Sequence, residues 1–151
     1  MTKLARKRII MDRTGKQEYL VRYHLLFREK ANTFDRNVDV PFNLFLHKIL
    51  LSDEPIFHDH PWNFFTIILK GGYYEHTPEG KFWRGPGYVG FKSANDLHYL
   101  ELKNETPCIT LFGHGRRKRA WGFINPETKE WEHYRDYLMK RGWRVKKRKT
   151  Q

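Results

Sequence analysis

The sequence predicts an all-β fold, a small barrel or sandwich that ends in one short helix, and three observations lead to this prediction. Short apolar runs rich in β-branched and aromatic residues recur along the chain. Turns that contain glycine or proline separate these runs. Helical spacing of apolar residues occurs only near the end, where Trp131, Tyr134 and Leu138 recur within 131–139.

The expected strands follow one another up to this terminal helix. They cover 8–12, 19–27, 41–51, 64–69, 88–91, 97–102, 108–112 and 121–124. The pattern of 41–51 fits a buried strand and also allows a short helix. Residues 28–40 are polar and irregular, so we expect a loop there that covers the functional site.

The chain of 151 residues is long enough to bury a core as one domain. We expect this domain over 1–144 and a basic C-terminal tail over 145–151. Cys108 is the only cysteine, so no intrachain disulfide can form and a reducing compartment is expected. The chain has no signal-peptide pattern and no apolar stretch of about 18 residues. We therefore expect a cytoplasmic location and no membrane association.

The net charge is +12, from 29 basic and 17 acidic residues. Such a surplus favours anionic partners, either a small anionic substrate or nucleic acid. The basic residues cluster in 1–8, 116–119 and 140–149. We interpret the two terminal clusters as solvated tails, with nucleic-acid binding as the alternative.

Three histidines are the candidate metal ligands. His58 and His60 are separated by one residue, so on a strand they point to the same side. His98 lies on a later predicted strand that can pair nearby. Three imidazoles suit iron, nickel, copper or zinc, and three protein ligands leave open positions, as in catalytic sites. Because only neutral imidazoles bind metals, we expect affinity to fall below about pH 6.

The order of these motifs resembles the cupin superfamily over about residues 54–102. A His-x-His pair is followed by the glycine turn 71–72, then by Pro86-Gly87, and finally by His98. The resemblance implies a cupin-type barrel, the double-stranded β-helix or jelly roll. Two features differ from the common pattern: the interval from Pro86 to His98 is longer, and phenylalanines replace a glutamate at 64–65.

A cupin motif without that glutamate resembles the three-histidine branch of the superfamily, in particular the cysteine dioxygenase-type thiol dioxygenases. Those enzymes show a similar His-Asp-His and a similar Gly-x-x-x-Glu stretch, which here runs from Gly71 to Glu75. The resemblance implies one divalent ion, with Fe(II) as the expected metal and zinc, nickel, copper or manganese as alternatives.

The glycines at 71–72 are interpreted as the loop of a two-residue hairpin. If Lys70 points to solvent, then residues 65, 67 and 69 point inward, and their neighbours across the hairpin share that face. Tyr74 and His76 would then lie inside and Glu75 outside. A regular count from His60 gives the opposite faces, so this interpretation requires a bulge at Pro61.

We therefore expect an iron-dependent dioxygenase that acts on a small anionic substrate. His76 is the expected catalytic residue, and substrate binding is assigned to Arg22, Arg84, Arg116 and Tyr74, because arginines pair with anions. Asp59 should face away from the metal. The alternatives are a non-enzymatic cupin that binds a small ligand or nucleic acid, and a zinc or manganese hydrolase or isomerase.

Overall fold

The structure is a computed structural model, and it describes residues 7–12, 14–26 and 41–140. The expected loop over 28–40 and the expected basic tail over 145–151 lie outside the described residues. Within the described ranges the expected all-β fold with one short C-terminal helix is confirmed. No helix in these ranges has the length and apolar character needed to cross a bilayer.

Eleven strands and one α-helix make up the described part of the chain. They are β1 (Lys7–Met11), β2 (Glu18–His24), β3 (Phe42–Ile49), β4 (Phe64–Lys70), β5 (Tyr73–Thr77), β6 (Gly80–Arg84), β7 (Val89–Lys92), β8 (Tyr99–Leu102), β9 (Cys108–Gly115), β10 (Gly122–Ile124), β11 (Trp131–His133) and α1 (Tyr134–Lys140). A short 3-10 turn, Lys103–Glu105, connects β8 to β9. The segment 41–51, for which a helix was the alternative, forms the strand β3.

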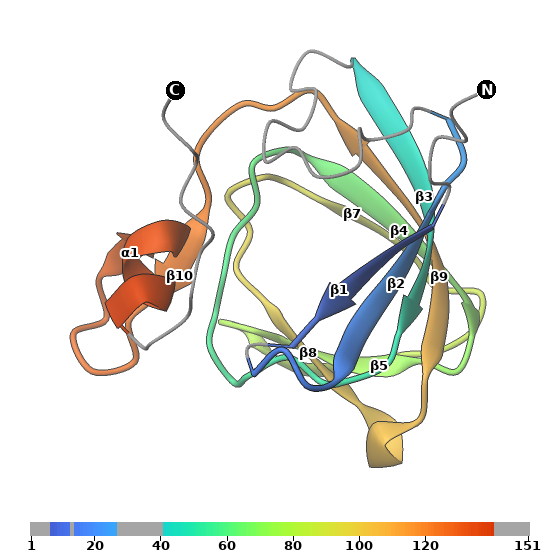
Figure 1. Ribbon diagram of the computed structural model, residues 1–151, viewed down its shortest axis with the longest axis horizontal. Coiled ribbons are helices and arrows are strands. Elements are labelled where there is room, and N and C mark those ends of the chain that lie inside the picture. Colours follow the sequence, from blue (N-terminus) through green and yellow to red (C-terminus); the bar gives the residue numbers. More distant parts are fainter. Residues whose placement is uncertain (1–6, 13, 27–40, 141–151) are drawn as a thin grey trace.

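The strands form a barrel from two antiparallel sheets. The larger sheet has the order β1-β2-β3-β9-β4-β7, and the smaller one has the order β6-β5-β8. Figure 1 shows the two sheets curving around a common interior, with β10 and α1 beside the barrel. Strands β10 and β11 pair with each other as a separate ribbon.

Both sheets contribute to a compact apolar cluster. It consists of Ile49, Ile68, Tyr73, Leu102 and Cys108, all buried. Cys108 is fully buried, and burial raises the pKa of its thiol to about 11. A thiol in this environment is a small core side chain rather than a nucleophile.

The predicted hairpin at Gly71-Gly72 is wrong. Strand β4 pairs with β7 and β9, whereas β5 pairs with β6 and β8. The two glycines therefore carry the chain from one sheet to the other. Both have positive φ, and a Cβ would lie 2.6 Å from the carbonyl oxygen of Pro107 at Gly71 and 2.7 Å from that of Arg84 at Gly72. Only glycine fits this corner without strain.

The predicted inward faces of β4 and β5 are also wrong. Residues 64, 66 and 68 are buried, and Leu69 is 52% exposed. On β5, Tyr73 and Glu75 are buried. The register between β4 and β9 shifts between Ile68 and Lys70, so counting back from Lys70 crosses an irregularity. Counting every second residue from His60 gives 64, 66 and 68, which are the buried positions, so no bulge at Pro61 is needed to explain the faces.

The terminal helix is shorter than predicted. Residues 131–133 form β11 and pair with β10, and α1 begins only at Tyr134. A turn held by Asn125, whose side-chain oxygen accepts hydrogen bonds from the backbone N–H groups of Glu127 and Thr128, returns the chain alongside β10. This local turn favours strand pairing over the first helical turn.

Candidate metal centre

His58, His60 and His98 converge on one point of the barrel. One ring nitrogen from each lies within 4.8 Å of the others, an arrangement that can hold a metal ion. The ring centroids are 4.8 to 5.1 Å apart. His58 and His98 also exchange two backbone hydrogen bonds of 3.1 Å. This isolated bridge, rather than the regular strands we expected, sets the distance between the two motifs.

The electrostatics of the cluster suit metal binding. Burial, followed by the neighbouring His98, lowers the pKa of His58 to about 3, and burial likewise keeps the pKa of His60 well below its usual range. Both imidazoles are therefore neutral, the form that donates a lone pair to a metal. In the described part of the chain, His60 Nδ1 is buried without a hydrogen-bond partner. The ring nitrogens of the three histidines therefore form a donor set that can bind a cation.

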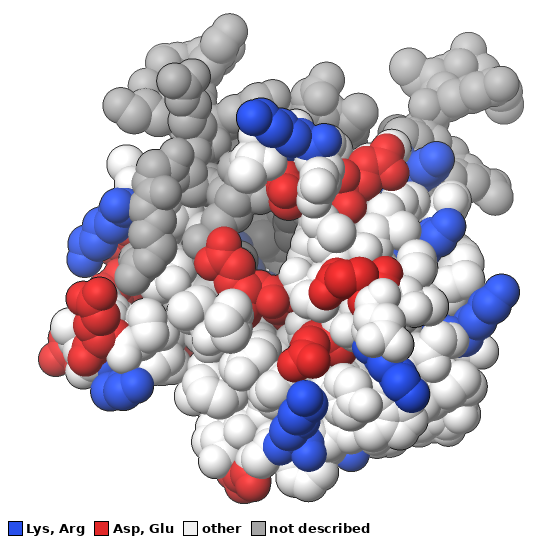
Figure 2. Space-filling view, turned by 90° about the horizontal axis from the view of Figure 1, so that it is seen from below, with Lys and Arg blue, Asp and Glu red and all other residues white. Residues whose placement is uncertain are grey.

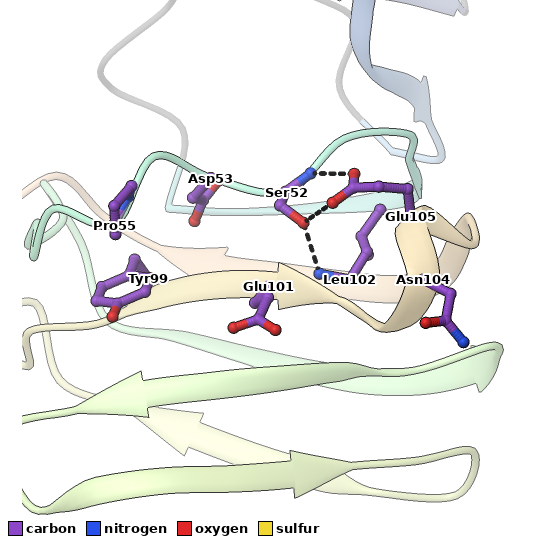
Figure 3. A pocket seen from close by; sticks show the side chains of 8 residues that line it. All are labelled: Ser52, Asp53, Pro55, Tyr99, Glu101, Leu102, Asn104 and Glu105. Carbon is purple, nitrogen blue, oxygen red and sulfur yellow. Dashed lines mark hydrogen bonds between the residues drawn. The ribbon is translucent and has the colours of Figure 1, made fainter.

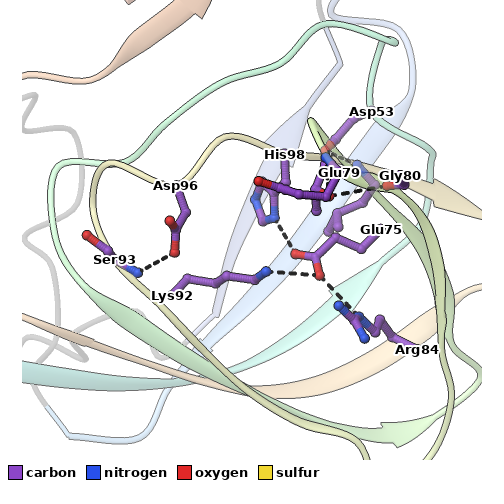
Figure 4. A network of polar contacts seen from close by, with 11 residues as sticks. Asp53, Glu75, Glu79, Gly80, Arg84, Lys92, Ser93, Asp96 and His98 are labelled. Atoms are coloured by element: carbon purple, nitrogen blue, oxygen red, sulfur yellow. Dashed lines mark hydrogen bonds and ion pairs between the residues drawn. The ribbon is translucent and has the colours of Figure 1, made fainter.

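Glu75 lies directly behind His98. The Nδ1–H of His98 donates to Oε2 of Glu75 over 2.7 Å, while Oε1 accepts from Arg84 Nε at 3.1 Å and pairs with Lys92 Nζ at 3.2 Å (Figure 4). Burial raises the pKa of Glu75, but the His98 hydrogen bond and Lys92 outweigh it and bring the pKa to about 2. The ionised carboxylate fixes the His98 tautomer and leaves Nε2 for a metal.

Asp59, between the first two histidines, joins the segment that carries them to the C-terminal unit, which consists of β10, β11 and α1. It is buried, and its Oδ1 accepts the Gly122 backbone N–H at 2.7 Å. Its Oδ2 accepts from Trp131 Nε1 at 2.9 Å and pairs with Arg119. Asp59 thus points away from the histidine cluster, as expected, and holds β10 and β11 against the segment that carries His58 and His60.

Aromatic rings surround the cluster. Trp121 and Phe123 lie 6.5 and 6.0 Å from the His58 ring, and Phe64 lies 4.4 Å from the His60 ring. Behind Trp121, the ring of Tyr134 on α1 stacks at 4.8 Å. The C-terminal unit therefore adds an apolar wall next to the ligands, which limits the access of water and strengthens electrostatic interactions there.

His76 and Tyr74 do not join the metal cluster. His76 stacks on Tyr99 at 4.3 Å and donates from Nε2 to Glu101 at 2.9 Å on the outer face of the small sheet. Tyr74 lies on the same face, with Lys81 Nζ 4.4 Å above its ring. Their outward positions follow from the sheet-to-sheet corner at residues 71–72.

The three predicted arginines occupy three different environments. Arg84 contacts Glu75, so one carboxylate separates it from His98. Arg22 is buried on β2, where its Nε donates to His47 Nε2 at 3.0 Å and its guanidinium lies 4.4 Å from the Phe45 ring. Arg116 is exposed in the loop after β9. Only Arg84 lies next to a residue that contacts a metal-ligand candidate.

Glu75 and Lys92 are the site residues that the sequence reasoning did not find. Glu75 ends the Gly-x-x-x-Glu stretch that resembles the thiol dioxygenases, but the predicted hairpin places its side chain on the outside of the barrel. Lys92 comes from β7, which pairs with β4 opposite Phe64. Its position depends on a sheet register that the motif does not encode, so no local signal pointed to it.

A hollow of about 440 Å³ lies along β8, and none of the three clustered histidines lines it. Ser52 donates to Glu105 at 2.7 Å and accepts the Leu102 backbone N–H at 2.8 Å (Figure 3). Burial raises the pKa of Asp53 to about 6, and the Leu100 backbone N–H and the Tyr19 hydroxyl donate to its carboxyl group. Figure 2 shows acidic side chains gathered on the face seen from below. Ser52 and Asp53 are thus held by neighbouring groups, and among the described residues only the three histidines form a group that can hold a metal ion.

Comparison with known proteins identifies the fold. No family and no curated protein matches the sequence. Among solved structures, FeII HppE matches with 15% identity and a TM-score of 0.54 over 72% of this chain and 56% of that one. A putative mannose-6-phosphate isomerase from Ralstonia eutropha matches with 14% identity and a TM-score of 0.51 over 64% and 84%. The fold is the cupin-type double-stranded β-helix.

At these identities the likeness describes the fold of this protein and not its chemistry. A double-stranded β-helix protein from Klebsiella pneumoniae matches with 12% identity and a TM-score of 0.49 over 70% of this chain and 84% of that one. The chain spans just over half the length of HppE. The chemistry of this protein therefore has to be argued from its own residues, beginning with the three histidines.

Proposed function

We propose that this cupin is an Fe(II)-dependent dioxygenase that acts on a small anionic molecule. The observation that carries the proposal is the set of three histidines whose ligand atoms lie within 4.8 Å of one another. Three protein ligands leave coordination positions open, which is the arrangement of a catalytic site rather than a structural one. Neutral ligands leave the site with a positive charge that attracts an anionic substrate.

His58, His60 and His98 would hold the ion, which when bound supplies the redox chemistry with oxygen. Glu75 keeps the proton of His98 on Nδ1, so that Nε2 points to the centre. Lys92 and Arg84 balance the charge of Glu75 and keep that carboxylate from binding the metal in place of the histidine. Trp121 and Phe123 form the apolar wall that limits water at the reacting molecule.

A thiol acid is the first substrate to test, because of the resemblance to the thiol dioxygenases. In that reaction both atoms of O₂ are added to the thiol sulfur, which gives a sulfinate without a further reductant. Protein loaded with Fe(II) without oxygen should change its absorption spectrum when cysteine is added. Admission of air should then consume one O₂ for each sulfinate formed.

Two variants and one alternative metal make this test specific. His98→Ala should abolish both the spectral change and the oxygen uptake. His76→Ala should leave both intact, since His76 lies on the outer face of the small sheet. If neither cysteine nor other small thiols and carboxylates alter the spectrum of the iron-loaded protein, the dioxygenase proposal is wrong. Activity with zinc or manganese alone would instead support the hydrolase or isomerase alternative.

A further inference from the structure

The outer face of the large sheet carries exposed phenylalanines at the end where β4 begins and β9 ends. Phe91 on β7 is 79% exposed, and Phe42 on β3 is 46% exposed. The register places Phe65 opposite Phe91 on one side and opposite Gly113 on the other, while Phe42 lies opposite Gly115. The three rings therefore lie around the last residues of β9.

The two glycines of β9 form the floor of a groove between these rings. Phe65 covers Gly113, where a Cβ would lie 2.3 Å from its ring. Among the described residues, a Cβ at Gly115 would meet only the Asn63 carbonyl oxygen, at 3.9 Å, so they leave the backbone there open. The groove has a volume of about 550 Å³, and its lining includes Phe42, Phe65, Phe91, Ser93, Gly113 and Gly115. We call it the phenylalanine groove.

Three cations follow the groove directly. Arg116, Arg117 and Lys118 are exposed in the segment after Gly115, and none forms an ion pair or a side-chain hydrogen bond with any described residue. The backbone N–H of Lys118 donates to the Pro61 carbonyl at 2.7 Å, which keeps this segment beside the start of β4. Arg119 is different, because it pairs with Asp59.

We propose that the phenylalanine groove and the cations 116–118 bind single-stranded nucleic acid. Exposed aromatic rings stack on unpaired bases, and neighbouring arginines and lysines bind the phosphates that connect them. A duplex hides the base faces that such rings require. A second copy of the chain fits less well, because both copies carry a net charge of +12 and the same three cations. This inference goes beyond the proposed metal chemistry.

The test uses the full chain and a fluorescently labelled 20-nucleotide oligothymidine, with anisotropy measured at 50 and 200 mM salt. Phe91→Ala should weaken binding about tenfold, since one stacked base is lost. The triple variant Arg116→Ala, Arg117→Ala, Lys118→Ala should reduce the slope of log affinity against log salt by about 2, since each phosphate contact contributes about 0.7.

Matched controls separate this surface from general charge and from the tail. Trp83→Ala removes an exposed aromatic ring from the small sheet, and Lys16→Ala, Lys48→Ala, Lys129→Ala removes the same charge elsewhere. Both should leave binding within about threefold of wild type. A chain truncated after residue 140 should still respond to Phe91→Ala.

Several results would overturn the inference. One is the absence of oligonucleotide binding at 50 mM salt. Another is an equal loss of affinity in the control triple variant, which would indicate nonspecific charge. If removal of residues 141–151 abolishes binding and Phe91→Ala has no effect, then the tail binds the oligonucleotide and the groove does not. Concentration-dependent dimerisation that Phe91→Ala abolishes, or binding to anionic vesicles in place of the oligonucleotide, would assign the groove to another partner.

Discussion

The Nδ1–H of His98 donates to the carboxylate of Glu75 over 2.7 Å, and this contact links the histidine cluster to a buried ion-pair network. Glu75 is 2% exposed and pairs with Lys92 and Arg84 through its other oxygen. A carboxylate in this position fixes the histidine ring and makes its free nitrogen a stronger ligand. Glu75 is therefore the residue outside the three histidines with the most direct influence on a bound metal.

Glu75→Gln should lower the affinity for a divalent metal by about 10- to 100-fold, because the amide is a weaker partner for the His98 Nδ1–H. The measurement is a competition titration with a chelator of known affinity. Glu101→Gln is the matched control, since Glu101 binds His76 on the outer face of the small sheet and should have no effect. Equal affinities in wild type and Glu75→Gln would mean that this hydrogen bond does not tune the site.

Metal binding should persist below pH 6, where the sequence alone predicts a loss of affinity, because burial lowers the pKa of His58 and His60 in the folded chain. The pKa of His58 is about 3 in the folded chain, so protons compete with the metal only as the pH approaches that value. Between pH 7 and pH 5 we therefore expect no loss of affinity from protonation of His58 or His60. A fall of a thousandfold over this range would mean that the imidazoles titrate near their usual pKa.

The lowered pKa values of His58 and His60 also make the metal-free fold sensitive to acid. The unfolded chain protonates these histidines near their usual pKa of about 6.5, whereas the folded chain keeps His58 and His60 neutral. The unfolded state then binds more protons, so the free energy of unfolding falls as the pH drops from 6.5 toward 3. Glu75, with a pKa lowered to about 2, adds to this loss below pH 4.5. Urea unfolding at pH 7 and pH 4.5 measures the first part, and equal stability at both values would contradict it.

Asp59→Asn should destabilise the fold by about 3 kcal/mol, because it leaves Arg119 without its buried partner and places an amide N–H group against other donors. Urea unfolding at pH 7 measures this change. Asp12→Asn, in the exposed turn after β1, is the control and should cost less than about 1 kcal/mol. A small effect at Asp59 would mean that the C-terminal unit is held mainly by its aromatic packing.

The succession of strands and the convergence of the three histidines could be predicted from sequence, because both depend on local patterns. Short β-rich runs between glycine and proline turns predict β1 to β4 and β7 to β10. His58 and His60 need only one intervening residue to share a face, and His98 follows the second turn of the cupin pattern. The structure brings these three side chains together.

The positions of Glu75 and His76 could not be predicted correctly, because they depend on strand pairing across the barrel. Two glycines after a strand can close a hairpin or carry the chain to another sheet, and their sequence is the same in both cases. The irregular register between Ile68 and Lys70 then reversed the assigned faces. Lys92 and Asp59 likewise depend on contacts between segments that are distant in sequence.

The amount of metal in protein purified without added metal tests the central claim most directly. Mass spectrometry should find about one iron ion per chain in the wild-type protein. His58→Ala, His60→Ala and His98→Ala should each lose most of it, because a site with three ligands cannot lose one and keep its affinity, whereas His76→Ala should retain it. Wild-type protein without any stoichiometric metal, or full metal content in all three ligand variants, would contradict the assignment of a metal centre to this protein.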